Sequence, residues 1–120
     1  MSPKPQSAEG VAGPVPSGAG VQVLCGFFEG LELAVDRDWF VIGRGRAADA
    51  VLAEPTISRA HAAIGFESDK GFFVQDLGST NGTLVNGQRE KWQRLADGDE
   101  IQMGKLQLRF SLASDPPGVG

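Results

Sequence analysis

Cysteine and histidine are nearly absent from this 120-residue sequence, which contains one of each, Cys25 and His61. A monomer with one cysteine cannot form an internal disulfide, and this pair cannot supply a zinc site of Cys and His ligands. Long hydrophobic runs are also absent. No stretch approaches the roughly 18 apolar residues of a membrane span, and the first twenty residues lack the apolar core of a signal peptide. We therefore expect a soluble cytoplasmic protein with no bound metal or cofactor and no membrane partner.

Positive charge is scarce, because 11 Lys and Arg residues stand against 15 Asp and Glu residues. Nucleic acids and acidic membranes attract dense positive fields, so this balance argues against both as general partners. Residues 41–61 differ from the rest, since they contain Arg44, Arg46 and Arg59 but only Asp49 and Glu54 as carboxylates. A local cationic area on an acidic protein indicates a small anionic ligand.

The composition divides the chain into one domain and two tails. Fourteen of the first twenty residues are Pro, Gly, Ala or Ser, and residues 114–120 read SDPPGVG. Such segments bury too little apolar surface to offset the entropy of ordering. We expect disordered tails at 1–20 and 114–120, one monomeric domain at 21–113, and no internal repeat.

The domain reads as all-β, because its apolar residues form short runs between turn residues and no helical spacing persists. Many short strands with Gly-rich turns predict an antiparallel two-sheet sandwich, with a small barrel as the alternative. Asn86-Gly87 predicts a two-residue turn, and residues 67–71 predict another hairpin. The predicted strands are 21–25, 31–35, 39–43, 60–66, 71–77, 83–86, 99–104 and 106–112.

The stretch FVIGRGRAADAVL at 40–52 approaches the glycine fingerprint of dinucleotide-binding folds. That fingerprint requires a helix that opens at the glycines, with its amides facing a pyrophosphate. Pro55 would interrupt a helix begun at Ala47, and no βαβ unit follows. The sequence therefore argues against a nucleotide site.

A hydrolase is a second hypothesis, since His61, Ser58 or Ser79, and Asp76 are the residue types of a catalytic triad. The G-x-S-x-G elbow is missing. A lone histidine more often holds a loop by hydrogen bonds than it titrates during catalysis. We therefore expect that the protein is not an enzyme.

Several small polar residues and arginines fall at the ends of the predicted strands. Loops at one end of a sandwich cluster, so groups far apart in sequence can meet there. Arginine offers a planar fork to two phosphate oxygens, hydroxyls donate singly, and an Asn amide bonds a peptide backbone. The alternative is that the small polar residues are ordinary turn residues and the arginines are solvated surface charges. The residues are Arg44, Ser58, Arg59, Ser79, Thr80 and Asn81.

Four blocks in order, GR at 43–44, SRAH at 58–61, DLGSTNGTLVNG at 76–87 and LADGDEIQMG at 95–104, resemble the forkhead-associated (FHA) domain. The resemblance covers about residues 21–112. It implies an eleven-stranded sandwich that binds phosphothreonine peptides through loops at one end. It also implies turn roles for Asp76, Asn86, Gly87, Gly98 and Asp99.

The resemblance also implies roles for individual residues. It assigns phosphate binding to Arg44, Ser58, Arg59 and Thr80, and binding of the peptide backbone to Asn81. It assigns a structural role in the loops to Gly43, His61, Ser79 and Gly82. Arg46 has no family counterpart and is interpreted as a charge at the rim.

The expected partner is a phosphothreonine protein that functions in trans, either a Ser/Thr kinase or its substrate. Some small FHA regulators bind their own phosphorylated N-terminal tail, but the threonines of this sequence are Thr56, Thr80 and Thr83, and none lies in the tail at 1–20. The remaining alternative is a scaffold that binds a protein through a sheet face, independently of phosphate.

Overall fold

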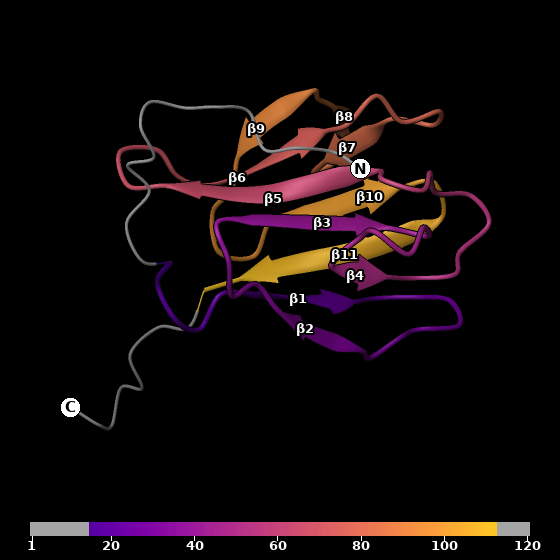
Figure 1. Ribbon diagram of the computed structural model, residues 1–120, viewed down its shortest axis with the longest axis horizontal. Helices are drawn as coiled ribbons and strands as arrows, with labels where there is room; N and C mark the ends of the chain where they lie inside the picture. Colours follow the sequence, from indigo (N-terminus) through magenta and orange to yellow (C-terminus); the bar gives the residue numbers. More distant parts are fainter. Residues whose placement is uncertain (1–14, 113–120) are drawn as a thin grey trace.

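The computed structural model describes residues 15–112, which form eleven strands in two sheets (Figure 1). The first sheet has the order β2-β1-β11-β10-β7-β8 and the second has the order β4-β3-β5-β6-β9. Two separate sheets make the fold a sandwich, so the barrel alternative is wrong. The strands are β1 Gly20–Val23, β2 Glu32–Ala34, β3 Trp39–Gly43, β4 Ala50–Val51, β5 Ala62–Glu67, β6 Gly71–Asp76, β7 Thr83–Val85, β8 Gln88–Arg89, β9 Trp92–Arg94, β10 Glu100–Met103 and β11 Leu106–Ser111.

The core lies between the sheets and follows from alternation along the strands. In β11, Leu106, Leu108 and Phe110 are buried while the residues between them are exposed, as expected for a strand with one face in the core. The Phe110 ring meets that of Phe72 from the other sheet, with a centroid distance of 5.4 Å. This contact joins the two layers.

The two predicted hairpins are confirmed. Strands β5 and β6 pair antiparallel as far as Glu67 and Gly71. Strands β7 and β8 are joined by Asn86 and Gly87, with φ angles of 51° and 86°. Positive φ at both central positions is the requirement of a type I′ turn.

Eight of the eleven strands overlap the predicted ranges, whereas β4, β8 and β9 were missed. The fold also begins before Val21, because Gly20 opens β1 and Ala19 is buried in the core. Residues 15–18 of the predicted tail are also described, and Val15 packs against the core. Residues 1–14 and 114–120 of the predicted tails lie outside the described residues.

The segment after β3 contains turns at 44–49 and then β4, which pairs parallel to β3. No helix opens at the glycines, which agrees with the rejection of a dinucleotide fingerprint. Within residues 15–112 there is also no helix that could cross a membrane.

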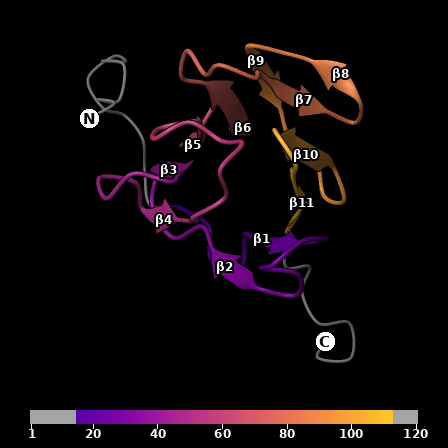
Figure 2. The ribbon, with the colours of Figure 1, turned by 90° about the vertical axis from the view of Figure 1, so that its right-hand side faces the viewer.

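The loops that follow β3, β4, β6 and β10 lie at one end of the sandwich, on the right in Figure 1 and toward the viewer in Figure 2. Strands β3, β6 and β10 run toward this end, and β5, β7 and β11 run away from it. The loop between β1 and β2 lies at the same end. The topology thus gathers segments 44–49, 52–61, 77–82 and 104–105.

Candidate functional site

The end of β3 packs directly against the backbone of the loop between β4 and β5. The Gly45 N–H donates to the Arg59 carbonyl over 3.1 Å. A Cβ on Gly43 would overlap that same carbonyl oxygen. Glycine at 43 is therefore required by close approach, and it allows Arg44 to leave the sheet beside Ser58.

Arg44 lies between two segments that are distant in sequence. Its backbone N–H donates to the Ser58 carbonyl over 3.1 Å, and its Nε donates to the Ile57 carbonyl over 2.6 Å. Among residues 15–112, its terminal guanidinium nitrogens form no hydrogen bond or ion pair. The hydrogen bond from Nε thus orients the Arg44 side chain, while the two terminal nitrogens remain available to a ligand.

Ser58 and Thr80 bring the second and third loops together. The Thr80 N–H donates to Ser58 Oγ over 3.1 Å. Ser58 Oγ accepts in this bond, so its own hydrogen is available for donation. Thr80 is exposed. The loops that carry Arg44, Ser58 and Thr80 are therefore held together by direct hydrogen bonds.

His61 is fully buried beneath these loops. The Ser58 N–H donates to its Nδ1 over 3.0 Å, so Nε2 carries the proton and donates to the Gly82 carbonyl over 2.8 Å. Burial lowers the pKa of His61 below 6.5, although the Gly82 carbonyl and the charge of Asp76 oppose the shift. A neutral imidazole thus bridges the segments that carry Ser58 and Thr80.

Asp76 organises the loop between β6 and β7. Its carboxylate accepts hydrogen bonds from the Ser79 hydroxyl and the Thr83 hydroxyl, over 2.6 and 2.7 Å, and from the Gly78 and Ser79 N–H groups, over 3.0 Å each. Burial acts to raise its pKa, but these hydrogen bonds outweigh burial and lower it. Ser79 Oγ in turn accepts from the Gly82 N–H.

The hydrolase hypothesis finds no support in these contacts. Ser58 reaches His61 through its backbone N–H rather than its hydroxyl, and the Ser79 hydroxyl donates to Asp76. A catalytic triad requires a hydroxyl that donates to the histidine and a carboxylate that accepts from the same histidine. Ser58, Ser79, His61 and Asp76 are not connected in this way.

Asn81 is exposed, and its Nδ2 donates to the Thr56 carbonyl over 2.8 Å. Thr56 was not predicted as part of the site. Its N–H and hydroxyl both donate to Glu54 Oε2, and its Oγ1 accepts from the Lys105 N–H over 2.7 Å. Thr56 thus connects Asn81 to the turn between β10 and β11. The only signal for Thr56 in the sequence is the carboxylate of Glu54, two residues before it.

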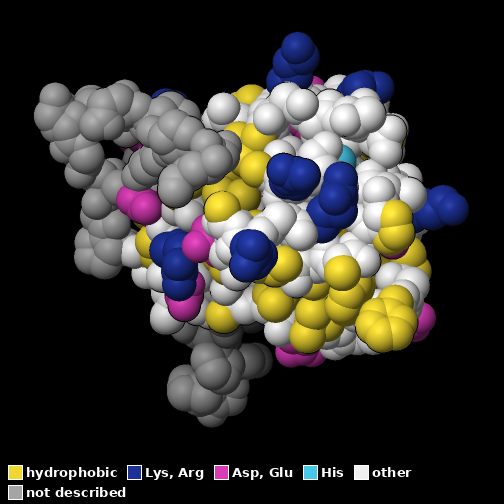
Figure 3. Space-filling model, turned by 45° about the vertical axis from the view of Figure 1, so that its right-hand side comes forward, with side chains coloured by type: hydrophobic (Ala, Val, Ile, Leu, Met, Phe, Trp, Pro, Cys, Tyr) yellow, Lys and Arg dark blue, Asp and Glu magenta, His cyan; other side chains and the backbone are white. Residues whose placement is uncertain are grey.

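Arg46 and Arg59 are exposed, and neither pairs with a carboxylate in the part of the chain that the structure describes. Lys and Arg side chains gather on this face in Figure 3. The local excess of positive charge is therefore not neutralised by neighbours within residues 15–112.

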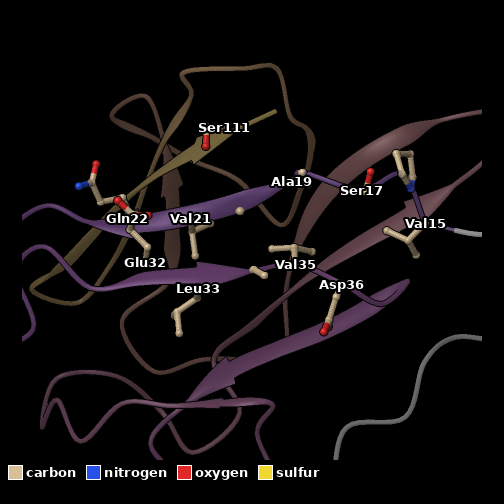
Figure 4. Close-up of a pocket in the computed structure, with 14 residues that line it drawn as sticks. Val15, Ser17, Ala19, Val21, Gln22, Glu32, Leu33, Val35, Asp36 and Ser111 are labelled. Carbon is tan, nitrogen blue, oxygen red and sulfur yellow. The ribbon is translucent and has the colours of Figure 1, made fainter. Parts of the chain in front are cut away.

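A separate hollow of about 700 Å³ lies beside β1 and the edge strand β2 (Figure 4). Apolar side chains such as Val15, Val21, Leu33 and Val35 line it together with polar groups at its rim. It contains no residue predicted for the phosphate site. The loop end and this hollow are therefore distinct features of the molecule.

The FHA domain family matches residues 40–104, from β3 through β10. This range exceeds half of the chain, so the protein belongs to the FHA domain family. The resemblance drawn from four short blocks is confirmed.

The chain is 40% identical over 96 residues to an oxoglutarate dehydrogenase inhibitor from Corynebacterium diphtheriae, covering 79% of this chain and 66% of that protein. It is 38% identical over 104 residues to the glycogen accumulation regulator GarA from Mycobacterium tuberculosis, covering 87% and 64%. The chain thus spans just under two thirds of the length of these relatives, both named as regulatory proteins.

The fold is also similar to that of an FHA domain solved in a structural and functional analysis of phosphothreonine-dependent FHA domain interactions. The TM-score is 0.73 and the sequence identity is 30%. The match covers 82% of this chain and 99% of that domain.

Proposed function

We propose that this protein binds phosphothreonine on a partner protein through the loops at one end of the sandwich. The observation that carries the proposal is the convergence of three loops. Arg44 donates to the Ile57 carbonyl beside Ser58, and Ser58 Oγ accepts from the Thr80 N–H. These contacts support a site in which the Arg44 guanidinium and the Ser58 and Thr80 hydroxyls bind one phosphate group.

The phosphate group interacts with Arg44, Ser58, Arg59 and Thr80. Phosphothreonine carries about −1.5 to −2 charges at neutral pH and offers three acceptor oxygens. The free terminal nitrogens of Arg44 can donate to two of these oxygens as a fork. An unmodified threonine offers a single hydroxyl and no charge, so it leaves most of these donors without a protein partner.

Discrimination against unmodified threonine follows from the same contacts. Loss of one partner of a buried charged pair costs roughly 2–5 kcal/mol. Arg44 is exposed in the free protein, so water compensates part of that loss. We expect the lower end of the range, a preference of about 30-fold for the phosphorylated peptide.

Asn81 interacts with the peptide backbone beside the phosphothreonine. An amide group can accept from a backbone N–H and donate to a backbone carbonyl. One Nδ2 hydrogen is directed to the Thr56 carbonyl, which leaves the second hydrogen and Oδ1 for the peptide. The residues that hold the loops are Gly43, His61, Ser79 and Gly82.

The ligand belongs to another protein, a Ser/Thr kinase or its substrate, and the FHA protein binds it as a cytoplasmic monomer without catalysis. Support comes from the threonines of this sequence. Thr83 is buried against Asp76 and Thr56 is bonded to Glu54. Thr80 itself belongs to the phosphate loop. None of the three is presented as a ligand.

The test is a binding titration with three matched peptide libraries that contain phosphothreonine, phosphoserine or threonine at one fixed position. We expect the phosphothreonine library to bind most tightly, about 30-fold above the threonine library. Equal affinity for the phosphothreonine and threonine libraries would contradict the proposal.

A phosphate-independent scaffold is the second candidate function. One observation favours it: Trp92 on β9 is 42% exposed and stacks on Phe73, with a centroid distance of 5.1 Å, away from the core. An aromatic sheet face of this kind can bind a protein. Binding that survives removal of the phosphate and is lost in Trp92→Ser would establish this alternative.

A further inference from the structure

The loop between β1 and β2 presents an aromatic side chain to solvent. Phe27 is 94% exposed and Leu31 is 38% exposed. Large hydrophobic side chains this open to water are informative when they lie together near a binding site. The loop contains one carboxylate, Glu29, and no cation, so its tip suits an apolar contact.

Phe27 is held in place by an ordered loop. The Glu29 N–H donates to the Gly26 carbonyl, the Leu31 N–H to the Phe28 carbonyl, and the Gly30 N–H to the Val23 carbonyl. Gly26 and Gly30 have φ angles of 88° and 92°, which glycine adopts without steric cost.

The Phe27 ring lies edge-on against Phe28, with a centroid distance of 5.1 Å and an interplanar angle of 87°. Phe28 itself packs partly against the core. Because the loop backbone is ordered, covering Phe27 restricts only its side-chain torsions, which are few in an aromatic residue.

The loop is connected to the candidate phosphopeptide site by a continuous path of contacts. The Leu24 N–H donates to the Gln107 carbonyl, and the Cys25 thiol donates to the Lys105 carbonyl over 3.7 Å. The Lys105 N–H donates to Thr56 Oγ1, and Thr56 accepts from Asn81 through its carbonyl.

The views of the molecule agree with this path. The loop between β1 and β2 lies at the same end as the phosphate loops in Figures 1 and 2, and hydrophobic side chains lie beside the Lys and Arg side chains in Figure 3. A peptide that leaves the phosphate site past Asn81 can therefore continue across the turn between β10 and β11 toward Phe27.

We propose that Phe27, with Leu31, forms an accessory site for a large apolar side chain of the same phosphothreonine peptide, several residues away from the phosphothreonine. This inference rests on the proposed function, because it extends the same peptide beyond Asn81. Phosphate contacts are common to every phosphothreonine ligand. The apolar contact selects among them.

The test uses an oriented phosphothreonine peptide library with eight degenerate positions on each side of the fixed residue. Eight extended residues span about 26 Å, so the library samples positions well beyond the neighbours of the phosphothreonine. The wild-type protein is compared with Phe27→Ser and Phe27→Leu. Leu112→Ser is the matched control, because Leu112 is 38% exposed and follows β11 at the opposite end of the sandwich.

We expect the wild type to select a large apolar residue at one position at least four residues from the phosphothreonine. Phe27→Ser should lower affinity for the selected peptide about tenfold, Phe27→Leu should retain most of it, and Leu112→Ser should be unchanged. Melting temperatures should be unchanged in both Phe27 variants, because Phe27 is 94% exposed, and should fall slightly in Leu112→Ser, because Leu112 is only 38% exposed.

Phosphate-dependent binding with no distant apolar preference, or with the same preference in Phe27→Ser, would overturn this inference and leave the proposed function intact. Equal capture of phosphorylated and unphosphorylated libraries would overturn the proposed function and, with it, the accessory site.

Discussion

Thr80 donates its backbone N–H to Ser58 Oγ over 3.1 Å, although 22 residues separate the two in sequence. The bond joins two protein groups, so it holds the loop after β4 against the loop after β6. Loops that are ordered in advance reduce the entropy cost of binding. The site should therefore be sensitive to substitutions of the groups that contact the phosphate and to substitutions that displace either loop.

Arg44→Ala should abolish phosphopeptide binding at concentrations that saturate the wild type. It removes the fork of donors to the phosphate and also leaves the Ile57 carbonyl without its 2.6 Å hydrogen bond. Loss of that bond should cost about 1 kcal/mol of stability, a fall of several degrees in melting temperature for a domain of this size. Calorimetric titration with a library-selected phosphothreonine peptide measures the first effect, and thermal unfolding the second.

Arg44→Lys is the matched variant, because it keeps the charge and removes the planar fork. We expect intermediate affinity. Arg46→Ala serves as the control for nearby charge and should mainly slow association, since a rim charge affects the on-rate more than the affinity. Unfolding of Arg44→Ala would instead assign Arg44 a structural role.

His61 should make the stability of the free domain depend on pH below neutrality. Its pKa in the folded protein is lowered from 6.5 by burial, so the unfolded chain takes up a proton at a higher pH than the folded chain does. Stability is therefore full above pH 6.5 and falls as pH decreases through that value, by at most about 1.4 kcal/mol per pH unit for one proton. Urea unfolding between pH 8 and pH 5 measures the slope.

The histidine contribution can be separated from that of the carboxylates. Asp76 and Glu54 also have lowered pKa values, from 3.8 and 4.5, so their effect begins only below about pH 4.5. His61 is the only histidine of the chain, and an NMR titration of its ring therefore reports one group. A folded-state pKa of 6.5 or higher would contradict the prediction, and His61→Gln should remove the slope between pH 6.5 and 5.

Gly43→Ala should destabilise the domain more than Gly87→Ala. A Cβ at Gly43 would overlap the Arg59 carbonyl, whereas the space around Gly87 is open. Gly87 has a φ of 86°, so alanine there is strained and should cost about 1 kcal/mol. A backbone overlap should cost about 3 kcal/mol or prevent folding. Equal stability of the two variants in urea would show that β3 can move away from Arg59.

The alternation of apolar residues predicted most of the sandwich but missed three strands. Strand β11 has three buried residues in a strict alternation, which the sequence displays directly. Strands β4 and β8 contain two residues each, and both residues of β8 are exposed. Strand β9 has Trp92 exposed at its start. Such strands form because an adjacent strand of the sheet supplies hydrogen-bond partners. This is a tertiary effect, so the local pattern of apolar residues does not reveal it.

The candidate site was predicted from residue types at strand ends, and the loop topology brings Arg44, Ser58 and Thr80 to the same end of the sandwich. Their binding of phosphate stays a prediction. Thr56 was missed because its role depends on partners at Glu54, Asn81 and Lys105, the last of which is 49 residues away. The exposed Phe27 was missed for a related reason. A hydrophobic residue within a sequence is expected in the core, and only the packing of Phe28 beneath it leaves Phe27 outside.

Substitutions of Asn81 should rank the phosphopeptide affinity as wild type, then Asn81→Ala, then Asn81→Asp. Alanine removes the amide bonds to the peptide backbone, at about 0.5–1.5 kcal/mol each, so affinity should fall about tenfold. Aspartate retains acceptors but cannot donate, and it places a negative charge beside the phosphate. Both variants also lose the hydrogen bond from Asn81 Nδ2 to the Thr56 carbonyl, so the melting temperature should fall by a few degrees, as for Arg44→Ala. Gln88→Glu controls for the added charge on an exposed strand. Titration of the same phosphothreonine peptide measures these affinities. Wild-type affinity in Asn81→Asp would mean that this side chain does not donate to the bound peptide. The peptide would then have to leave the phosphate site over a different part of the loop end than the path toward Thr56 and Lys105.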